Sequence, residues 1–298
     1  MNDNASPLVS VVIPTYNHAH LLRRALTSVM TQTYVNWEAI VVDNYSQDNT
    51  DQVISELQDS RIKLVKFSNN GVIAASRNTG VRHSSGEWIA FLDSDDWWTP
   101  GKLQLCLEGA ASDTNLVYHD MEIIGVKSFG IFRRKIKSRQ LKAPVVIDLL
   151  VKGNPIATSS VVVRKKPLDS VGGMNEAPAM TAAEDYHTWL LISQQPGQLQ
   201  YVEKSLGYYL VHAQSVSQKD MSRPMRAAIA GFLPLLDERQ KHIAFGRIIY
   251  ARTRFLFLKG RRSLLIRHLC YCMKFGNAEI KLKAMAMILT IKIKKMIR

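Results

Sequence analysis

Short apolar runs alternate with helical patterns over the first 125 residues, and this repeat restricts the fold more than any other feature. The runs are rich in β-branched residues and lie at Val9–Ile13, Ala39–Val42, Ile62–Phe67 and Trp88–Leu92. The last run is apolar at every position, which is typical of a strand covered on both faces. Strand–helix units of this length predict an α/β fold with a doubly wound, mostly parallel, Rossmann-like sheet.

The second half of the chain has a less regular pattern. Lys127–Lys142 carries seven basic residues and no acid, and is interpreted as a mobile or inserted loop. Strands are expected at Ser159–Val163 and Tyr208–Val211, with a helix at Glu184–Ser193 between them. From about Ser222 onward the pattern is helical, with basic residues set among Leu, Ile, Phe and Met.

Polar residues directly follow three of the predicted strands. They are Thr15–Asn17, Asp43–Ser46 and Asp93–Asp96. Ligands of an open parallel sheet bind outside the carboxyl ends of its strands, so these residues are expected to share one edge. Carboxylates placed together repel one another unless a divalent cation or hydrogen-bond donors compensate them. Hard carboxylate oxygens suit Mg²⁺ or Mn²⁺, and such a cation can in turn hold a diphosphate.

The sequence lacks the glycine-rich loops that bind phosphate in many α/β enzymes. It has no G-x-x-x-x-G-K-[ST] segment, and no G-x-G-x-x-G follows the first strand. This disfavours a Walker-type ATPase or kinase and a dinucleotide-dependent dehydrogenase. The first alternative function is that of a sugar-nucleotide pyrophosphorylase, which has a glycine-rich, lysine-bearing loop after the first strand. The segment at this position, Pro14–His18, is not such a loop, which disfavours this alternative. A metal ion is then expected to neutralise most of the diphosphate charge, as in nucleotide-sugar transferases.

Four ordered motifs carry a resemblance to one enzyme family. They are Val11–Asn17, Val41–Asp48, Ser76–Gly80 and Leu92–Asp96. Together they resemble the inverting family-two glycosyltransferases of the bacterial surface-polysaccharide type, whose fold is called GT-A. The match covers roughly residues 7–215. The sequence departs from the family pattern at Asn44-Tyr45, where a second acid and a glycine are more usual.

The resemblance implies a domain organisation and an activity. Residues 1–220 would form the GT-A catalytic domain, with a nucleotide-sugar half at about 7–125 and an acceptor half at about 126–220, and residues 221–298 a basic helical extension. The implied enzyme depends on Mn²⁺ or Mg²⁺ and uses a nucleoside-diphosphate sugar, a UDP-sugar. It transfers a hexose or N-acetylhexosamine, with inversion, to a hydroxyl of a saccharide or lipid-linked acceptor. Such enzymes build capsule, lipopolysaccharide and related polysaccharides.

The same resemblance assigns residues to the nucleotide end of the site. Thr15 and Tyr16 line the nucleotide pocket, and Asp43 accepts a hydrogen bond from the base, such as from uracil N3–H. Arg77 faces the diphosphate or the acid cluster, and Asp93 holds the ribose. The alternatives are that Tyr16 packs at a strand end, that Asp43 caps a helix and that Arg77 makes a surface ion pair.

A pair of acids two residues apart marks the metal end of the site. Asp93-Ser94-Asp95 matches the D-x-D signature of the family, and carboxylates at this spacing in an extended segment lie on the same side. By resemblance, Asp95 binds the metal, while Asp93 contributes to both the metal and the ribose. His212, in a segment resembling the family's H-x-x-S-x-S, is a further candidate for the metal or the diphosphate. Asp96 either joins this group or caps the helix that follows.

The catalytic base is expected on the acceptor side, at the start of a helix. Thr181–Tyr186 resembles the family's E-D motif. Asp185 is the implied base, which takes the proton from the acceptor hydroxyl as that oxygen attacks the anomeric carbon. Glu184 orients the acceptor or the base, and the alternative is that both acids only complement the helix dipole. Gly172–Met174 resembles a glycine-containing acceptor loop.

The net charge of +14 resides in the last sixty residues. Residues 239–298 contain 16 Lys and Arg and one acid, which leaves residues 1–238 with a net charge of −1. Bases alternate there with apolar runs such as Phe255–Leu258, a composition typical of helices at an anionic membrane surface. A helical bundle with a solvated basic face is the alternative. The intact acid clusters disfavour a non-catalytic nucleic-acid-binding module, which is the second alternative function.

Cysteine content and hydropathy indicate the compartment. Cys106, Cys270 and Cys272 are too few for a disulfide framework or a four-thiolate zinc site. Met1–Ser6 is short and polar, so no signal peptide is expected. No apolar run approaches the ~20 residues that cross a bilayer. We therefore expect a cytoplasmic protein that associates peripherally with the inner face of the cell membrane.

Overall fold

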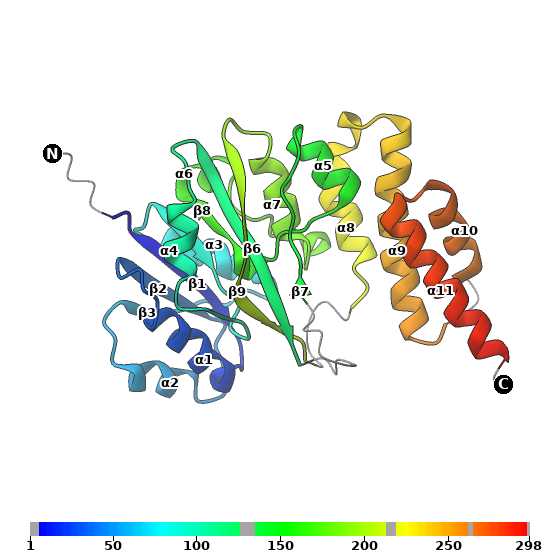
Figure 1. Ribbon diagram of the computed structural model, residues 1–298. Coiled ribbons are helices and arrows are strands. Elements are labelled where there is room, and N and C mark those ends of the chain that lie inside the picture. The colour runs from blue at the N-terminus through cyan, green and yellow to red at the C-terminus, as the bar shows by residue number, and fades with distance from the viewer. Residues whose placement is uncertain (1–5, 126–134, 213–218, 262–264, 297–298) are drawn as a thin grey trace. The chain divides into compact units, whose positions relative to one another are not determined.

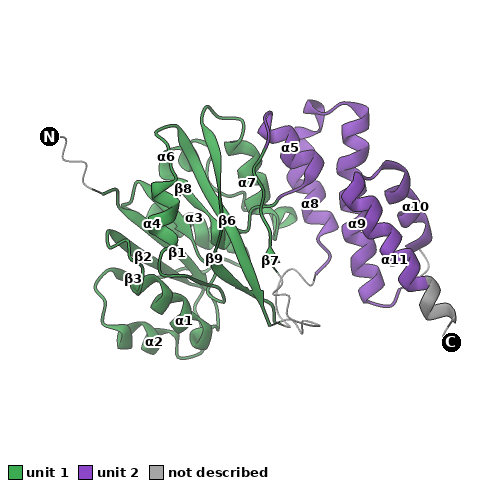
Figure 2. Ribbon diagram, in the orientation of Figure 1, with its two compact units in different colours: residues 1–141, 155–212 green, residues 142–154, 213–298 purple. Residues whose placement is uncertain are grey.

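The computed structural model describes residues 6–125, 135–212, 219–261 and 265–296, with the side chains of the last helix described up to Ile291. The chain divides into two compact units (Figure 2). The first, named the α/β unit, contains residues 1–141 and 155–212. The second, named the helical unit, contains residues 142–154 and 213–298, so a segment from the middle of the chain folds with the C-terminal helices.

One sheet forms the centre of the α/β unit. Its strands are β1 (Val9–Thr15), β2 (Trp37–Asp43), β3 (Ile62–Lys66), β4 (Trp88–Phe91), β5 (Trp97–Trp98), β6 (Thr114–Ile124), β7 (Lys135–Ile136), β8 (Val162–Arg164) and β9 (Gln198–Leu210). The order is β3-β2-β1-β4-β8-β6-β9-β5, and β7 pairs with β6 (Figure 1). The first four strands run parallel, as do β6 and β9, whereas β8 is antiparallel to β4 and β6. The predicted α/β class with its parallel first half is confirmed, and antiparallel strands enter beyond β4.

Helices cover both faces of this sheet. They are α1 (Ala19–Met30), α2 (Thr50–Leu57), α3 (Ile73–Arg82), α4 (Lys102–Glu108), α6 (Lys165–Ser170) and α7 (Glu184–Ile192), with short 3-10 turns η1 (Thr158–Ser160) and η2 (Pro178–Met180). Successive side chains of a strand point to opposite faces. Ile13 of β1 belongs to the core cluster that includes Leu26 of α1, whereas Val12 lies against Gly80 of α3. Therefore α1 and α3 lie on opposite faces of the sheet.

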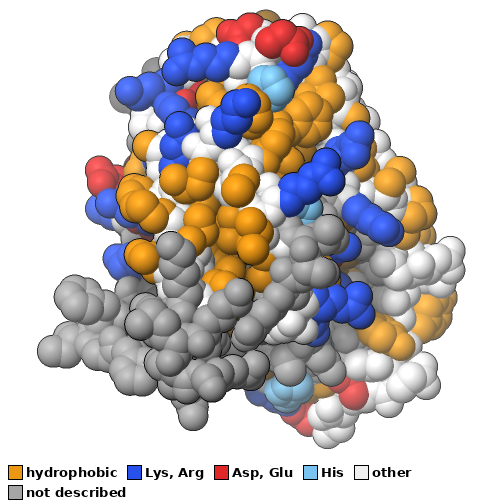
Figure 3. Space-filling model, turned by 90° about the vertical axis from the view of Figure 1, so that its right-hand side faces the viewer, with side chains coloured by type: hydrophobic (Ala, Val, Ile, Leu, Met, Phe, Trp, Pro, Cys, Tyr) orange, Lys and Arg blue, Asp and Glu red, His pale blue; other side chains and the backbone are white. Residues whose placement is uncertain are grey.

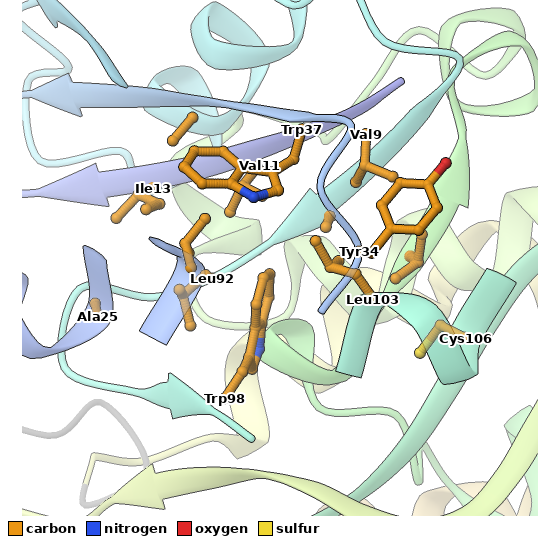
Figure 4. Packing of buried hydrophobic residues seen from close by; sticks show 14 of the residues in the cluster. Val9, Val11, Ile13, Ala25, Tyr34, Trp37, Leu92, Trp98, Leu103 and Cys106 are labelled. Atoms are coloured by element: carbon orange, nitrogen blue, oxygen red, sulfur yellow. The ribbon is translucent and has the colours of Figure 1, made fainter. Parts of the chain in front are cut away.

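The core beneath α1 is built from the alternate residues of β1. Val9, Val11 and Ile13 are fully buried there, and they join aromatic and aliphatic side chains from β2, β5 and α4 (Figure 4). Cys106 of α4 lies in the same cluster, and burial raises the pKa of its thiol to about 11. This thiol is therefore a packing group rather than a nucleophile.

The strand predicted at Ser159–Val163 begins later than expected. Residues Thr158–Ser160 form the 3-10 turn η1, and β8 starts only at Val162. The Ser160 hydroxyl donates to the carbonyl of Ala157 at 2.7 Å. Hydroxyl side chains that bond to the nearby backbone compete with strand pairing, which explains why the β pattern is interrupted here.

The short strand predicted at Tyr208–Val211 is the end of a much longer one. Strand β9 spans Gln198–Leu210 and runs parallel to β6. Its register along β6 jumps from Val202 to Ser205, so the two charged residues between them lie at a bulge. These exposed charges interrupt the apolar pattern and hide the strand in the sequence.

The basic segment predicted as a loop is only partly described. Residues 127–134 lie outside the described residues, and Lys135–Ile136 forms β7 against β6. After it, the N–H of Ser138 donates to Asp120 Oδ1 at 2.7 Å, and the Ser138 hydroxyl donates to the carbonyl of Pro155 at 2.8 Å. The end of this segment is therefore tied to β6 and not an open loop.

The helical unit has a hydrophobic core of its own. Its helices are α5 (Val145–Lys152), α8 (Ser222–Ile229), the 3-10 helix η4 (Ala230–Leu235), α9 (Glu238–Leu258), α10 (Leu265–Phe275) and α11 (Ala278–Met296). A capping box between Asp237 and Gln240 starts α9, against which α5, α10 and α11 pack. The buried cluster comprises Leu256, Leu265, Leu269, Cys272, Ile280, Ala284 and Met287. The helical pattern predicted from Ser222 is confirmed, and many of its apolar side chains are buried in the core of the helical unit.

Hydropathy along these helices is too low for a transmembrane helix. In the part of the chain that is described, no helix combines the length and the apolar character needed to cross a membrane.

Replacing Gly80 by Ala tests the packing of α3 on β1. A Cβ atom at Gly80 would lie 2.3 Å from Val12 Cγ1, so the helix and the strand must separate. We expect Gly80→Ala to lower the free energy of unfolding by about 1–3 kcal/mol, although Ala favours helix over Gly by about 1 kcal/mol. Gly101→Ala is the control, because its Cβ would meet Leu105 Cδ1 at an ordinary 3.5 Å. Urea unfolding measures the free energy of unfolding of both variants. If Gly80→Ala were as stable as Gly101→Ala, this packing would be contradicted.

Candidate active site

The candidate site lies where the first strands of the sheet end. Thr15, the last residue of β1, is paired in register with Asp43, the last residue of β2. Strand β4 lies on the other side of β1, and Asp93 follows shortly after its end at Phe91. The three predicted polar groups therefore share one edge of the sheet, as expected for the carboxyl ends of parallel strands.

Arg77 connects this edge to the start of α7. Its side chain is only 4% exposed; Nη2 donates to Asp93 Oδ1 at 2.6 Å and Nη1 donates to Glu184 Oε1 at 2.7 Å. Burial acts to lower the pKa of Arg77, but the charges of Asp93 and Glu184 outweigh it and raise that pKa above its ordinary value. The surface ion pair considered for Arg77 is therefore wrong, because this guanidinium is buried and paired twice.

The D-x-D pair is held in a turn after β4. The N–H of Asp93 donates to Ser159 Oγ at 3.1 Å, which fixes the start of the turn. Asp95 Oδ2 lies 2.9 Å from His212 Nε2, although 117 positions separate these residues in the sequence. The carbonyl of Asp95 also accepts from Arg24 at 2.9 Å. The fold thus brings the predicted His212 to the D-x-D turn.

Asp96 belongs to the acid group and does not cap the next helix. It is 1% exposed, and its Oδ1 accepts from the N–H of Leu210 at 3.0 Å. Helix α4 instead has Gly101 at its N-cap position, so the capping alternative for Asp96 is wrong. Among the described residues, Asp96 Oδ2 has no hydrogen-bond partner, which leaves a buried carboxylate oxygen beside Asp95.

The acid turn fits a divalent cation by its chemistry. Burial, followed by the charge of Asp93, raises the pKa of Asp95. Burial, followed by the charges of Asp95 and Asp93, raises the pKa of Asp96 well above its ordinary value. A hard cation would relieve this repulsion and use the unpaired oxygen. Within the described ranges, no three or more His, Cys, Asp or Glu side chains are already grouped as a metal site.

The two acids that open α7 have different environments. Glu184 is buried, and its oxygens accept from Arg77 and from the N–H of Ala182 at 2.6 Å. Asp185 keeps some exposed surface, and its oxygens accept from the Thr158 hydroxyl at 2.8 Å and the Tyr186 N–H at 2.6 Å. Burial, followed by the negative charge of Glu184, raises the pKa of Asp185 to about 6. A partly exposed carboxylate that titrates near neutrality suits a general base.

The backbone next to these acids is strained. Ala182 has a φ of 78°, in the left-handed region that residues with a Cβ rarely adopt. Its N–H in this conformation reaches Glu184 Oε2. Strained residues of this kind persist where the surrounding structure fixes them, often at functional sites. Here the strain helps to hold the Glu184 carboxylate toward Arg77.

The glycine pair at Gly172-Gly173 forms a loop held by α3. Both residues have a positive φ, of 79° and 75°. A Cβ at Gly173 would lie 2.6 Å from Asn78 Oδ1, so glycine allows the close approach. Asn78 accepts from the N–H of Met174 and donates to its carbonyl, both at 2.8 Å. The loop is therefore fixed to the residue that follows Arg77.

The predicted nucleotide end of the site contains a hydroxyl that is unpaired among the described residues and two exposed aromatic rings. Thr15 Oγ1 is buried without a partner among the described residues. Tyr16 and Tyr45 follow β1 and β2 and are 52% and 56% exposed. A packing role for Tyr16 at the strand end is therefore wrong. Tyr45 has a φ of 55°, so it adopts a glycine-like conformation where the family usually has glycine.

Asp43 is fully buried and already hydrogen-bonded. It accepts from Lys66 Nζ at 2.7 Å and from the N–H of Ser46 at 3.1 Å. Helix α2 starts at Thr50 with Asn49 at its N-cap position, so Asp43 is not the helix cap considered as its alternative. Its carboxylate fixes the loop that carries Tyr45.

Two hydroxyl residues join the halves of the site, and no motif in the sequence identified them. Thr158 donates to Asp185, and Ser159 Oγ accepts from the N–H of Asp93. Both lie in η1, and the strand predicted at Ser159–Val163 includes Ser159 but not Thr158. The run of hydroxyl side chains at Thr158–Ser160 was the available signal, because such residues favour local hydrogen bonds over strand pairing.

Comparison with known proteins agrees with this geometry. A family model described as Glycosyl transferase family 2 matches residues 10–169. WfgD of Escherichia coli, described as a UDP-Glc:alpha-D-GlcNAc-diphosphoundecaprenol beta-1,3-glucosyltransferase, is 35% identical over 187 residues, covering 62% of this chain and 69% of WfgD. WfaP of the same species, with the same description, is 29% identical over 221 residues, covering 74% of this chain and 83% of WfaP.

Solved structures show the same fold. S. aureus TarS 1–349 in complex with UDP-GlcNAc aligns with a TM-score of 0.62 and 20% identity, over 91% of this chain and 82% of that one. The mannosyltransferase PcManGT from Pyrobaculum calidifontis, in complex with GDP-Man and Mn²⁺, aligns with a TM-score of 0.62 and 19% identity, over 97% and 81%. The site thus belongs to a GT-A-type glycosyltransferase. The chain is a member of glycosyl transferase family 2, as its four motifs predict.

Replacing Arg77 by Met tests the buried ion pairs. The change leaves Asp93 and Glu184 without their shared cation, so we expect the free energy of unfolding to fall by about 3–5 kcal/mol at pH 8. The loss should shrink at pH 5, because protonation of the stranded carboxyl groups removes the buried charge. Urea unfolding at both pH values measures the effect.

Arg23→Met is the matched control for this prediction. Arg23 pairs with Glu56, and both side chains are largely exposed, at 46% and 44%. Exposed ion pairs contribute about 0–1 kcal/mol. If Arg77→Met lowered the free energy of unfolding as little as the control does, the buried ion pairs of Arg77 would not stabilise the fold as predicted.

Proposed function

We propose that this enzyme transfers a hexose or N-acetylhexosamine from a UDP-sugar, with inversion, to a hydroxyl of a lipid-linked saccharide acceptor. The product would extend a bacterial surface polysaccharide such as capsule or lipopolysaccharide. The observation that carries the proposal is that Arg77 joins Asp93 of the acid turn to Glu184, the residue directly before Asp185, a partly exposed carboxylate that titrates near pH 6. Asp185 suits the role of a general base, and the acid turn suits the binding of a metal ion and a diphosphate.

The relatives support the proposed substrates. WfgD and WfaP are described as enzymes that use UDP-Glc and a GlcNAc-diphosphoundecaprenol acceptor. TarS is solved with UDP-GlcNAc, and PcManGT with GDP-Man and Mn²⁺. We transfer from these proteins a nucleotide-sugar donor, a diphosphate-lipid acceptor and a dependence on Mn²⁺ or Mg²⁺. A lipid-linked acceptor would hold the enzyme at the inner face of the cell membrane.

The donor would bind along the carboxyl edge of the sheet. Thr15 and Tyr16 would line the nucleotide pocket, where the exposed Tyr16 ring is accessible to a ligand and the buried Thr15 hydroxyl is unpaired among the described residues. Asp43 would contribute an acceptor for the base or hold the loop that surrounds it. Asp93 would bind the ribose and remain fixed by Arg77.

Asp95, Asp93 and His212 would hold the divalent cation. When bound, Mn²⁺ or Mg²⁺ supplies positive charge that offsets the charge of the departing nucleoside diphosphate. The proximity of His212 Nε2 to Asp95 Oδ2 and the buried free oxygen of Asp96 support this position.

Asp185 would be the general base. It accepts the proton of the acceptor hydroxyl while that oxygen forms its bond to the anomeric carbon, and the bond to the diphosphate oxygen breaks on the opposite face. One displacement of this kind inverts the configuration at that carbon. Thr158 holds the Asp185 carboxylate in place, and Glu184, already neutralised by Arg77, orients the acceptor side.

A donor and acceptor panel tests the proposed function. The protein is incubated with UDP-glucose, UDP-N-acetylglucosamine or GDP-mannose, a short-chain GlcNAc-diphosphate lipid and Mn²⁺, and products are identified by mass spectrometry. We expect the acceptor to gain one sugar from a UDP donor, with loss of product when EDTA removes the metal. Nuclear magnetic resonance should show a β linkage from the α-configured donor. Synthesis of a UDP-sugar from UTP and a sugar phosphate, or retention of nucleic acid at physiological salt, would favour the alternative functions.

Replacing Asp185 by Asn tests the base. We expect the rate of transfer to fall by about 10²–10⁴-fold, while the dissociation constant for the UDP-sugar stays unchanged. Activity of the native enzyme should fall as the pH drops through about 6, because the protonated carboxyl cannot accept a proton. A pH–rate profile and donor titration by calorimetry measure these effects.

The same variant should be more stable than the native protein. Because the pKa of Asp185 is raised, its charge disfavours the folded state above about pH 6 and has no effect below about pH 4. Asp185→Asn should therefore raise the free energy of unfolding by about 1–3 kcal/mol at pH 7.5. Asp169→Asn, an exposed change on α6, is the control and should alter neither activity nor stability. Full transfer activity in Asp185→Asn would overturn the assignment.

A further inference from the structure

Helix α11 is apolar on two opposite faces. Ile280, Ala284 and Met287 recur at helical spacing and are buried in the core of the helical unit. Leu282, Met285 and Leu289 also recur at helical spacing, but they are 62%, 46% and 55% exposed. With about 100° of rotation per residue, the second set points about half a turn away from the first. The exposed set, named the outer face, has no packing role in the bundle.

One lysine, Lys281, borders the outer face. Lys281 is exposed and lies about 40° around the helix from Met285. The acid of this helix, Glu279, is paired with Arg247 and Lys283. The outer face therefore has a cation on one side, and the acid on its other side is compensated by two bases.

A basic groove adjoins the same helix. It has a volume of about 610 Å³ and is lined at the junction of α9, α10 and the start of α11 by Arg239, His242, Lys274, Phe275, Asn277 and Lys281, among others. No acidic residue is among its lining residues. Lys281 belongs both to this groove and to the border of the outer face, so the two features are continuous.

Charge and hydropathy together select the occupant of this surface. A second copy of the chain would bring Lys281 and the basic groove close to the same bases of its partner, which is unfavourable without intervening anions. Nucleic acid would pair with the lysines but leave the three apolar side chains in contact with water or phosphate. An anionic lipid bilayer satisfies both, because headgroup phosphates meet the cations and the acyl region receives the apolar side chains.

We propose that the outer face of α11 lies in the interface of an anionic bilayer, with Leu282, Met285 and Leu289 inserted and lipid phosphates bound by Lys281 and the basic groove. In the view of Figure 3, groups of hydrophobic side chains lie next to Lys and Arg side chains. The inference deepens the proposed function, because a lipid-linked acceptor is presented at such a surface. It assigns membrane binding to one face of α11 rather than to the whole basic C-terminal region.

Vesicle sedimentation of the full chain tests the apolar contact. Native protein is mixed with phosphatidylglycerol–phosphatidylcholine vesicles, or with phosphatidylcholine vesicles alone, in the absence of donor and acceptor. We expect binding to the anionic vesicles, and about tenfold or greater weakening in the variant Leu282→Ser/Met285→Ser/Leu289→Ser. The matched control is Val35→Ser/Leu235→Ser, which removes exposed apolar side chains of 75% and 47% exposure elsewhere and should bind like the native protein.

A second pair of variants tests the cationic contact. Lys274→Gln/Lys281→Gln should weaken binding to anionic vesicles about tenfold and reduce its salt dependence. Lys166→Gln/Lys204→Gln removes the same charge from exposed positions of the α/β unit and should change binding little. Competition with inorganic phosphate separates a free-phosphate site from a lipid surface, because only the former loses vesicle binding at low millimolar phosphate.

Measurements of the unfolding temperature and of the transfer activity of the triple variant distinguish the possible outcomes. The outer-face residues are exposed, so the triple variant should unfold at the same temperature as the native protein, and loss of folding would instead place them in the core. Transfer to a water-soluble acceptor should be unchanged, so failure of the proposed function would not affect the vesicle result. Vesicle binding of the triple variant equal to that of the native protein would overturn the proposal. Sedimentation showing a native dimer that the triple variant abolishes, without vesicle binding, would assign the face to a second copy.

Discussion

One buried positive charge organises the catalytic edge of this protein. Arg77 extends from α3 between Asp93, after β4, and Glu184, at the start of α7. Without it, the buried Glu184 carboxylate and the partly exposed Asp93 carboxylate would lose their shared cation, and breaking a buried pair costs about 3–5 kcal/mol. Because Asp185 follows Glu184 directly, the same pair of bonds sets the position of the proposed base relative to the proposed diphosphate site. The arginine therefore connects the turn after β4 to the start of α7, which are the proposed donor and acceptor sides of the site.

A second connection runs through the 3-10 turn η1 and makes the arrangement rigid. Thr158 holds Asp185, while the neighbouring Ser159 holds the start of the Asp93 turn. The left-handed backbone at Ala182 is maintained within the same framework. Reactive groups that are positioned before the substrate arrives lower the barrier, because their reorganisation does not occur during the reaction. The two connections together provide that preorganisation.

Local patterns predicted the parts of the site that lie at the ends of strands. Thr15, Asp43 and the D-x-D pair could be placed on one edge, because the carboxyl ends of parallel strands always meet there. The hydroxyl pair in η1 could not be placed, since its partners are distant in the sequence. Strand β9 was underestimated for a different reason: two charged residues at its bulge interrupt the apolar pattern that identifies a strand.

The sequence by itself determined the sheet class, the enzyme family and the residues that gather at the catalytic edge, because these depend on periodicity and on motifs read along the chain. Only the tertiary structure decided how two adjacent acids differ. Glu184 is neutralised by an arginine 107 positions away, whereas Asp185 is left to titrate near pH 6. It also decided which apolar residues of the basic tail are buried in the bundle and which remain on the outer face of α11. Burial and charge are set by neighbours in space, which the order of residues does not specify.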